Sequence, residues 1–331
     1  MTLAAELRES TRRALRRVPD LPAALEAAER RRRHLVFYRF LFLPALSLPL
    51  VGALGAGAIW PESLLFVLGG VGGLTVLLVY LAGYSRLTRA LATAWRQNAV
   101  APALRVVGFQ PPGGAPAGAE ARQTDVLLKL FPALALSFPR VIRPTRELEL
   151  HHLGLQELGA HKVYVTHVYA AVRGQGWLRT VFLGPVASAP CPDPQEVLVV
   201  REMGVLGFLE DVKRGLTGLR RVQLPDPTFE ALYSVYARTE AAAAVLHPAF
   251  RDALVQLARD SSSRPMVAFH DGWVHVLIPH QGFLTPHRWA RVSEDRLTSD
   301  LEALLQATLL AAVAAGASPA ELLASLRESS A

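Results

Sequence analysis

Two apolar runs near the start of the chain determine its architecture: residues 36–59 read VFYRFLFLPALSLPLVGALGAGAI, and residues 64–84 read LLFVLGGVGGLTVLLVYLAGY. A helix that crosses the hydrocarbon core of a membrane needs about 20 apolar residues, and both runs reach that length. Only residues 60–63 (WPES) separate them. The pattern therefore predicts a transmembrane helical hairpin, in which Pro44 and Pro49 are tolerated by local adjustment of the first helix.

Arginines are concentrated on the two flanks of these runs. Nine arginines and five acidic residues precede the first run, Arg39 lies near its start, and four arginines with no acidic residue follow the second run up to residue 105. Basic flanks stay on the cytoplasmic side, so we expect an inner-membrane, multi-pass protein with both termini in the cytoplasm. The arginines expected to contact the membrane surface are Arg30, Arg31, Arg32, Arg33, Arg39, Arg86 and Arg89.

The excess positive charge indicates a lipid partner. The formal net charge is +7, yet residues 106–331 hold 21 basic and 22 acidic side chains and are nearly neutral. A nucleic-acid-binding protein would carry a basic patch on its folded domain, whereas this basicity lies beside the apolar runs. We expect contact with a bilayer that has anionic headgroups, a protein partner on the cytoplasmic side, and no nucleic acid or cofactor.

The chain divides into four segments by composition. Residues 1–34 read as a basic cytoplasmic helical segment of one or two short helices, with a break at Pro19 and Pro22. Residues 35–85 form the hairpin, and residues 86–123 form a basic helix followed by a Pro/Gly-rich linker. Residues 124–331 form a cytoplasmic domain. One face of the first helix is apolar: Leu3, Leu7, Ala14 and Val18.

The cytoplasmic domain alternates apolar and polar residues with the period of β-strands. Residues 161–173 and 177–186 flank Gly174-Gln175-Gly176 and predict one hairpin, and residues 266–270 and 273–278 flank Asp271-Gly272 and predict another. Further strands are expected at residues 196–201, 219–224 and 229–237.

Helix signals follow these strands. Thr239 is expected to cap a helix that Pro248 restarts, with a buried stripe of Phe250, Leu254 and Leu257. Ser293 caps a helix that runs to residue 315, Gly316 ends it, and Ser318-Pro319 opens a short last helix. The predicted class is α+β, with an N-terminal two-helix transmembrane hairpin followed by an antiparallel-sheet domain with a C-terminal helix.

Two histidines fall on one face of the hairpin at residues 266–278. Its turn pairs His270 with Trp273 and Ala268 with His275, which places the two histidines diagonally, about 7 Å apart at Cβ. A metal ion would need a third ligand, and no short spacing of cysteines or carboxylates supplies it, so we expect a polar sheet face here. His151, His152 and His161 are similar cases. His167 shares a strand face with Val163 and Val165, which predicts partial burial.

Other chemical signatures are weak. The sequence has no Walker loop, GxSxG, HExxH, CxxC or GxGxxG motif. Cys191 is the single cysteine, and we interpret it as an ordinary thiol without catalytic neighbours. Asp193, Asp226 and Glu230 could pair as acid and base, although Asp226, between two prolines, is typical of a turn. No catalytic, cofactor-binding or metal-ligating residue is therefore predicted.

One stretch carries a family resemblance. It comprises the Pro225–Pro227 turn, the strand at 229–236, the alanine-rich segment 239–245 and Leu246-His247-Pro248, after the segment RTVFLGP at 179–185. With two preceding apolar runs, it resembles the bacterial domain-of-unknown-function family numbered thirty-one thirty-seven over most of the chain. The resemblance implies the same architecture and no assigned activity.

The chain departs from that family at three positions. An aspartate and an arginine common in relatives correspond to Thr239 and Ala243, and the usual threonine before Pro248 is His247. A polar pocket present in relatives would be altered here. We interpret the chain as an uncharacterised membrane protein with a cytoplasmic binding or scaffolding domain, more in keeping with a non-enzyme. A membrane-bound enzyme whose site is built from scattered residues is the alternative hypothesis.

Overall fold

The computed structural model divides the chain into two compact units. The first unit holds Met1–Val18, Ala103–Phe283 and Thr298–Ala331, and the second holds Pro19–Pro102 and Leu284–Leu297. Within them the structure describes residues 3–59, 64–110, 118–131, 145–158, 160–174, 177–192, 195–201, 218–260, 264–280, 291–322 and 324.

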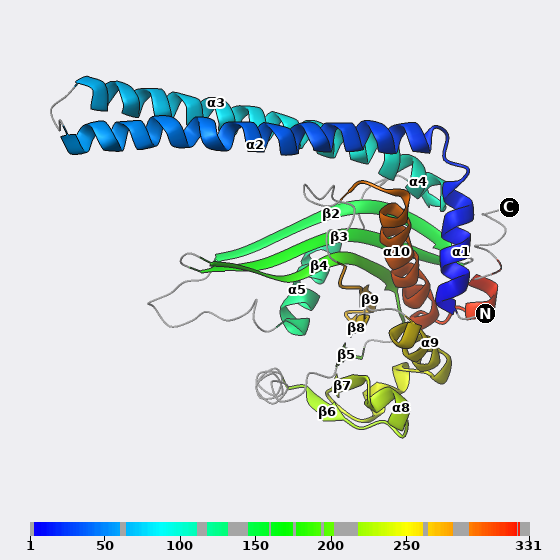
Figure 1. Cartoon of the computed structure of the whole chain (residues 1–331). Helices are drawn as coiled ribbons and strands as arrows, with labels where there is room; N and C mark the ends of the chain where they lie inside the picture. Colours follow the sequence, from blue (N-terminus) through cyan, green and yellow to red (C-terminus); the bar gives the residue numbers. More distant parts are fainter. Residues whose placement is uncertain are drawn as a thin grey trace. The chain divides into compact units, whose positions relative to one another are not determined.

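The second unit is built on two long helices that lie side by side, α2 (Leu21–Ile59) and α3 (Leu64–Trp95) (Figure 1). A π-helical turn, η1 (Arg96–Val100), continues α3 into α4 (Ala101–Val106). The predicted helical hairpin is confirmed as a hairpin. The basic residues 23–33 belong to the same helix as the first apolar run, because their alanines, glutamates and arginines are strong helix formers.

Only one helix in the searched part of the chain is long and apolar enough to cross a membrane, and it lies outside the hairpin. It is α10 (Glu294–Ala314), and 94% of its most apolar stretch is buried inside the protein. Such burial on all sides is typical of a core helix. The side chains of residues 41–73, which carry most of both apolar runs, lie outside the described residues.

The first unit is centred on a nine-stranded sheet in the described part of the chain, with the order β1-β2-β3-β4-β9-β8-β5-β7-β6. Neighbouring strands are antiparallel throughout, as the sequence predicts. The strands are β1 (Phe109–Gln110), β2 (Thr145–Leu158), β3 (His161–Gly174), β4 (Trp177–Pro190), β5 (Val197–Arg201), β6 (Arg220–Val222), β7 (Tyr233–Ala237), β8 (Met266–His270) and β9 (Trp273–Leu277).

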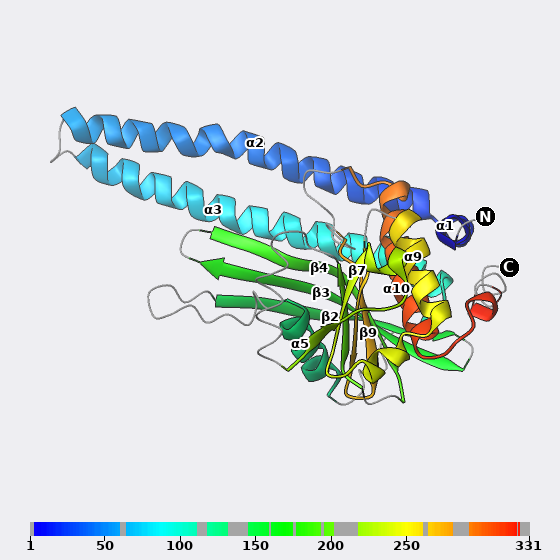
Figure 2. The ribbon, with the colours of Figure 1, turned by 90° about the horizontal axis from the view of Figure 1, so that it is seen from below.

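Helices cover both faces of this sheet (Figure 2). α5 (Ala119–Leu130) buries Val126, Leu127 and Leu130 in a core cluster with alternate residues of the central strands, such as Leu198 and Ala268. The intervening residues form the opposite face, where Phe269 meets Phe250 of α9 (Pro248–Asp260) edge to face at 6.0 Å. Because both faces are buried, the central strands are apolar on both sides.

The segment at 229–237 differs from its predicted single strand. Residues Pro227–Glu230 form a helical turn, α8, and only Tyr233–Ala237 pair as β7. The cause is Asp226, whose side chain accepts hydrogen bonds from the backbone N–H groups of Thr228 and Phe229, both at 3.1 Å. This is N-cap chemistry, and a proline in the first turn reinforces it.

The predicted helix signals near the C-terminus are largely confirmed. Thr239 Oγ1 accepts the Ala242 N–H at 3.2 Å, although the capped element is a short 3-10 helix, η2 (Ala241–Val245). The stripe of α9 is buried as expected. Ser293 Oγ accepts the Arg296 N–H at the start of α10, and Gly316, at φ +102°, follows its end. Residues 319–322 are helical.

Gly184 of β4 lies where the backbone after β9 continues alongside β4. Ile278 N–H donates to Pro185 O at 3.1 Å, and His280 N–H donates to Leu183 O at 2.8 Å. A Cβ atom added to Gly184, at φ +156°, would lie 2.0 Å from Ile278 O. Only glycine allows the two backbones to approach this closely.

We expect Gly184→Ala to lower the free energy of unfolding by about 1–3 kcal/mol or more, because the clash is with backbone. Gly316→Ala is the matched control, since its φ is also positive but its Cβ would meet nothing within 4 Å. The control should cost only about 1 kcal/mol. Thermal unfolding of the purified variants measures both, and equal losses would contradict the clash.

Candidate functional site

The arginines predicted to contact a membrane lie on both helices of the second unit. Tyr38 of α2 donates a hydrogen bond to Val79 O of α3 at 3.3 Å, and its ring stacks on Tyr80. Because the two helices of a hairpin run antiparallel, residues before Tyr38 lie beside residues after Tyr80. The fold therefore brings two groups of arginines that are distant in sequence to a similar position along the hairpin axis. We call them the arginine collar: Arg30, Arg31, Arg32, Arg33, Arg86 and Arg89.

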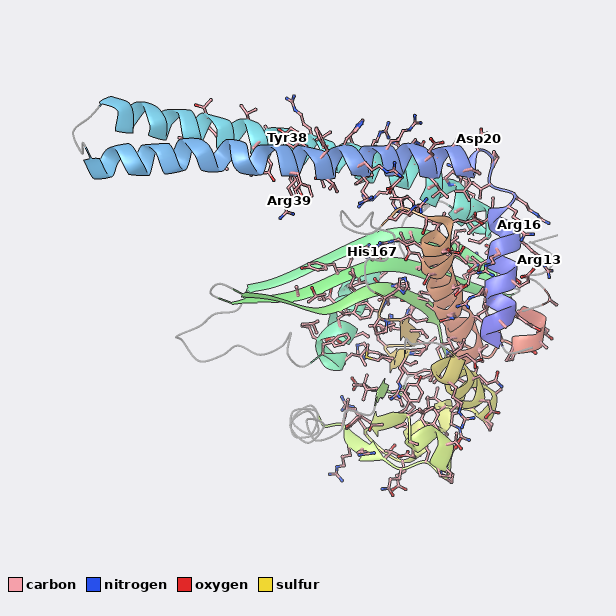
Figure 3. The ribbon with its side chains drawn as sticks, viewed as in Figure 1. Arg13, Arg16, Asp20, Tyr38, Arg39 and His167 are labelled. Atoms are coloured by element: carbon pink, nitrogen blue, oxygen red, sulfur yellow. The ribbon has the colours of Figure 1, made fainter. Side chains whose placement is uncertain are left out.

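Most of the collar faces solvent. Arg30, Arg31, Arg33, Arg86 and Arg89 are exposed, and Arg32 is half-buried. Arg39, also half-buried, lies one turn inside the apolar run and is labelled beside Tyr38 in Figure 3. Exposed guanidinium groups are good donors for phosphate oxygens.

Glu29 is the buried acid of this helix pair. Arg32 donates two hydrogen bonds to its carboxylate, both at 2.8 Å, and Arg33 Nε donates a third at 3.2 Å. The hydrogen bonds from Arg32 lower the pKa of Glu29 to about 2, against the opposing effect of burial and with help from the Val292 N–H and Arg33. Glu29 is thus ionised at neutral pH and orders part of the collar.

An apolar surface continues the hairpin beyond the collar. The exposed large apolar residues that the structure describes all lie on α2 and α3, and their exposure ranges from 39% at Leu77 to 66% at Phe37. They are Phe37, Phe40, Leu74, Leu77, Leu78, Val79 and Leu81. Contiguous exposed apolar surface of this kind marks a site that a lipid or protein covers.

A second polar cluster lies in the first unit, between α5 and the sheet. Gln123 Nε2 of α5 donates to Ser188 Oγ of β4 at 3.0 Å, and Ser188 Oγ lies 2.9 Å from His275 Nδ1 of β9. The pairing of His275 with Ala268, and of His270 with Trp273, is as predicted. The polar neighbours Ser188 and Gln123 agree with the expected polar sheet face at His275, but α5 covers this face and leaves His275 only 1% exposed.

This contact has the form of a serine–base pair but not its chemistry. Burial lowers the pKa of His275 to about 3, with smaller effects of His270 and Arg122. So weak a base does not activate a serine hydroxyl near neutral pH. Ser188 and Gln123 are also buried, and His275 Nε2 has no hydrogen-bond partner among the described residues. We interpret the cluster as a support for α5.

Charged residues surround the same helix. Lys129 Nζ of α5 hydrogen-bonds to the Glu196 carboxylate, lies 3.2 Å from His270 Nδ1 and forms an ion pair with Asp125 Oδ2 at 3.1 Å. His270 Nε2 lies 2.8 Å from Asp125 Oδ2, and Arg238 binds Glu196 from the other side. Although burial opposes it, the hydrogen bond and charge of Lys129 hold the pKa of Glu196 below its usual range.

Polar contacts also fix the position of α10 in the first unit. Arg8 of α1 (Leu3–Leu15) donates two hydrogen bonds to Glu302, and His280 Nε2 lies 2.8 Å from the buried Asp300. Removing one partner of such a contact leaves the other buried and unsatisfied, which costs more than the contact itself contributes. These polar groups therefore position α10, while its leucines and alanines supply the apolar area.

The remaining candidates have structural roles where they are described. Asp226 caps α8, while Glu230 Oε1 accepts the Leu224 N–H at 2.9 Å, so the two do not form an acid–base pair. Asp193 lies outside the described residues. Cys191 is a buried thiol. His167 is half-buried, as predicted (Figure 3). Within the searched part of the chain, no three His, Cys, Asp or Glu side chains are placed to hold a metal ion.

His247, which precedes Pro248, caps the start of α9. Its Nδ1 accepts the Phe250 N–H at 3.2 Å in the first turn of α9, and its Nε2 lies 3.0 Å from Val313 O of α10. The neutral ring with its proton on Nε2 satisfies both contacts. Histidine therefore adds a link between α9 and α10 that a threonine side chain is too short to make.

Sequence reasoning missed α5, which supplies Gln123, Asp125 and Lys129. Residues 110–119 read as a linker, and the helix begins at its last residue, after Gly118 at φ +75°. The available signal was the apolar spacing Val126, Leu127 and Leu130, which places three side chains on one helix face. β2 was also missed, because the alternation of its leucines is interrupted at the register shift between His152 and Gly154.

We expect His275 to make the domain sensitive to acid. Its pKa is about 3 in the folded state and about 6.5 when unfolded, so unfolding takes up a proton below pH 6.5. Its contribution is full above about pH 6.5 and is lost as the pH falls toward about 3. Thermal unfolding measured across this range should show a weaker pH dependence for His275→Leu. His34→Gln, at an exposed position, should behave as wild type; an unchanged slope for His275→Leu would contradict the assignment.

Comparison with known proteins agrees with the resemblance seen in the sequence. Residues 188–312 match the family model described as "Protein of unknown function (DUF3137)", a shorter stretch than the resemblance suggests. No curated protein and no solved structure matches the chain significantly. The matched stretch begins at Ser188 in β4 and ends inside α10, so it covers the α+β region that holds His270 and His275. Over residues 188–312, the chain is therefore similar to the DUF3137 family, whose function is unknown.

Proposed function

We propose that the chain is an integral membrane protein, in which α2 and α3 cross the bilayer and anchor a cytoplasmic binding or scaffolding domain. One observation carries the proposal. Large apolar side chains are exposed on the hairpin, whereas none of those described in the remainder of the chain is exposed. A folding chain buries such side chains unless lipid or a partner covers them, and the two apolar runs have the length of membrane spans.

Aromatic and basic residues support a membrane boundary near Tyr38. The rings of Tyr38, Tyr80 and Tyr84 stack in succession, at centroid distances of 5.8 and 5.7 Å. Tyrosine is enriched at membrane–water interfaces, where its ring is apolar and its hydroxyl is hydrated. The arginine collar follows at once, so the change from apolar to basic surface occurs over about two helical turns.

The collar supports an orientation and a lipid partner. Arginines on both helices favour the cytoplasmic side, which would place both ends of the hairpin there and residues 60–63 outside. The exposed guanidinium groups would meet the phosphates of anionic headgroups, each with about 1 kcal/mol of attraction. The inner membrane of a bacterium has this surface.

The cytoplasmic domain is proposed to bind rather than to catalyse. Its polar cluster between α5 and the sheet is closed, with Gln123, Ser188 and His275 each at most 3% exposed. Its charged residues are used in holding α5 to the strands. Because these polar groups hold α5 to the sheet and are not free for catalysis, we propose that the domain binds a partner.

Topology is tested with single cysteines in a Cys191→Ala background, since Cys191 is the only native cysteine. A membrane-impermeant maleimide should label Glu62→Cys in intact cells and should label Asn98→Cys, at an exposed position of η1, only after lysis. Recovery of the protein in the soluble fraction, or labelling of Asn98→Cys alone in intact cells, would overturn the proposal.

The lipid partner is tested in vesicles of phosphatidylcholine with and without phosphatidylglycerol. We expect the anionic lipid to raise the melting temperature of wild type, and the triple variant Arg30→Gln, Arg31→Gln, Arg33→Gln to lose most of that rise. The control is Arg220→Gln with Arg221→Gln, two exposed arginines of β6 that should leave the rise intact. An equal rise in the collar variant would contradict the assignment.

The binding role is tested by placing a photo-crosslinking amino acid at exposed positions of the full-length protein in cells. Gln256 on α9 and Arg220 on β6 are exposed and distant in sequence. A scaffolding domain should crosslink reproducibly to one defined protein from one of these two positions, and not from the other. Adducts that are identical at all exposed positions, or absent from all of them, would argue against a specific binding surface.

A further inference from the structure

The Glu29 carboxylate joins two segments of the second unit that are far apart in the sequence. Besides its three hydrogen bonds from Arg32 and Arg33, it accepts the backbone N–H of Val292 at 3.1 Å. The side chain of Glu29 is only 10% exposed, and Val292 is buried. A buried carboxylate with charged donors makes stronger hydrogen bonds than a neutral, solvated pair.

Val292 lies two residues before Glu294, the first residue of α10. Ser293 Oγ accepts the Arg296 N–H, and Ser293 O accepts the Leu297 N–H at 3.3 Å, which defines the first helical turn. Glu29 thus holds the residue just before the N-cap, and its negative charge lies near the positive end of the helix dipole. From Asp300 to Ala314 every residue of α10 is buried, so the helix has little freedom to shift without disturbing its neighbours.

Glu29 is also fixed to the apolar part of the hairpin. α2 is helical without interruption from Leu21 to Ile59. Glu29 precedes Val36 by seven residues, which is about 10 Å along a helix axis. Helices are stiff along their axes, so a displacement of the apolar segment carries Glu29 with it.

We propose that Glu29 is a positioning residue that couples the membrane hairpin to α10, so that movement of α2 in the bilayer changes the order of the first turn of α10. The coupling rests on the proposed function, since only an inserted hairpin is held by the bilayer. According to this proposal, the thickness and tension of the membrane regulate the anchored domain through the Glu29 carboxylate. The hydrogen bond from Val292 to Glu29 does not depend on pH near neutrality, because Glu29 stays ionised there.

Bilayer thickness supplies the perturbation. A helix longer or shorter than the local hydrocarbon thickness tilts or shifts to adapt. The full-length protein is placed in phosphatidylcholine bilayers of short and of long acyl chains, and hydrogen exchange is measured for the backbone amides of residues 292–297. Glu29→Ala removes the tie. Glu26→Ala is the matched control, because Glu26 is an exposed glutamate on the same helix one turn earlier.

We expect exchange at residues 292–297 to differ severalfold between the two bilayers in wild type and in Glu26→Ala. In Glu29→Ala the difference should vanish, and the Val292 amide should exchange about tenfold faster in both bilayers, as expected for loss of a hydrogen bond to a charged group. Exchange in α9 serves as the check that the variant is folded. Glu29→Gln, which keeps one acceptor oxygen, should fall between wild type and Glu29→Ala.

Two outcomes would overturn the coupling alone. One is equal exchange in both bilayers for a wild-type protein whose Glu62→Cys labelling shows insertion. The other is a thickness dependence that persists in Glu29→Ala. If Glu62→Cys labelling shows that the hairpin does not insert, the proposed function fails, and the coupling fails with it because it requires an inserted hairpin.

Discussion

Both faces of the antiparallel sheet must be kept from water, and the rest of the first unit follows from that constraint. The strands alternate apolar residues on both sides, so a helix is needed on each face. α5 comes from before the long strands and covers the face of Leu198 and Ala268. α9 and α10 come from after them, and Phe250 meets Phe269 on the opposite face. A sheet covered on one side only would leave half of the core exposed.

The second unit solves the opposite problem. Its two helices meet each other along one side through Tyr38 and the small residue Gly83, where an added Cβ would strike the Tyr38 hydroxyl. The outer sides of both helices keep large apolar residues exposed. Two helices alone cannot bury their own outer surfaces. The apolar side chains of the hairpin therefore need another molecule to cover them, whereas the described large apolar side chains of the rest of the chain are not exposed. We propose that a bilayer supplies this cover, and that the contact of Glu29 with Val292 ties the hairpin to the start of α10.

The sequence alone determined the elements that depend on local chemistry. The hairpin of two helices, the strands around Gly174 and Asp271-Gly272, the restart at Pro248 and the end of α10 near Gly316 follow from length, period, turn residues and caps, which act over a few residues. The family resemblance also rests on such local features, namely the Pro225–Pro227 turn and the restart at Pro248. Local reasoning failed at residues 229–232, where the Asp226 cap competed with a strand pattern, and at α5, whose large apolar residues are confined to its last five positions.

Only the tertiary structure decided which distant residues meet. The arginine collar needs the antiparallel register of α2 and α3, and the contact of Glu29 with Val292 joins residues 263 positions apart. His275 reads as a polar sheet residue until α5 is placed over it, and that placement lowers its pKa to about 3. Burial and long-range pairing are properties of the packed chain, whereas caps, turns and apolar period are properties of its neighbouring residues.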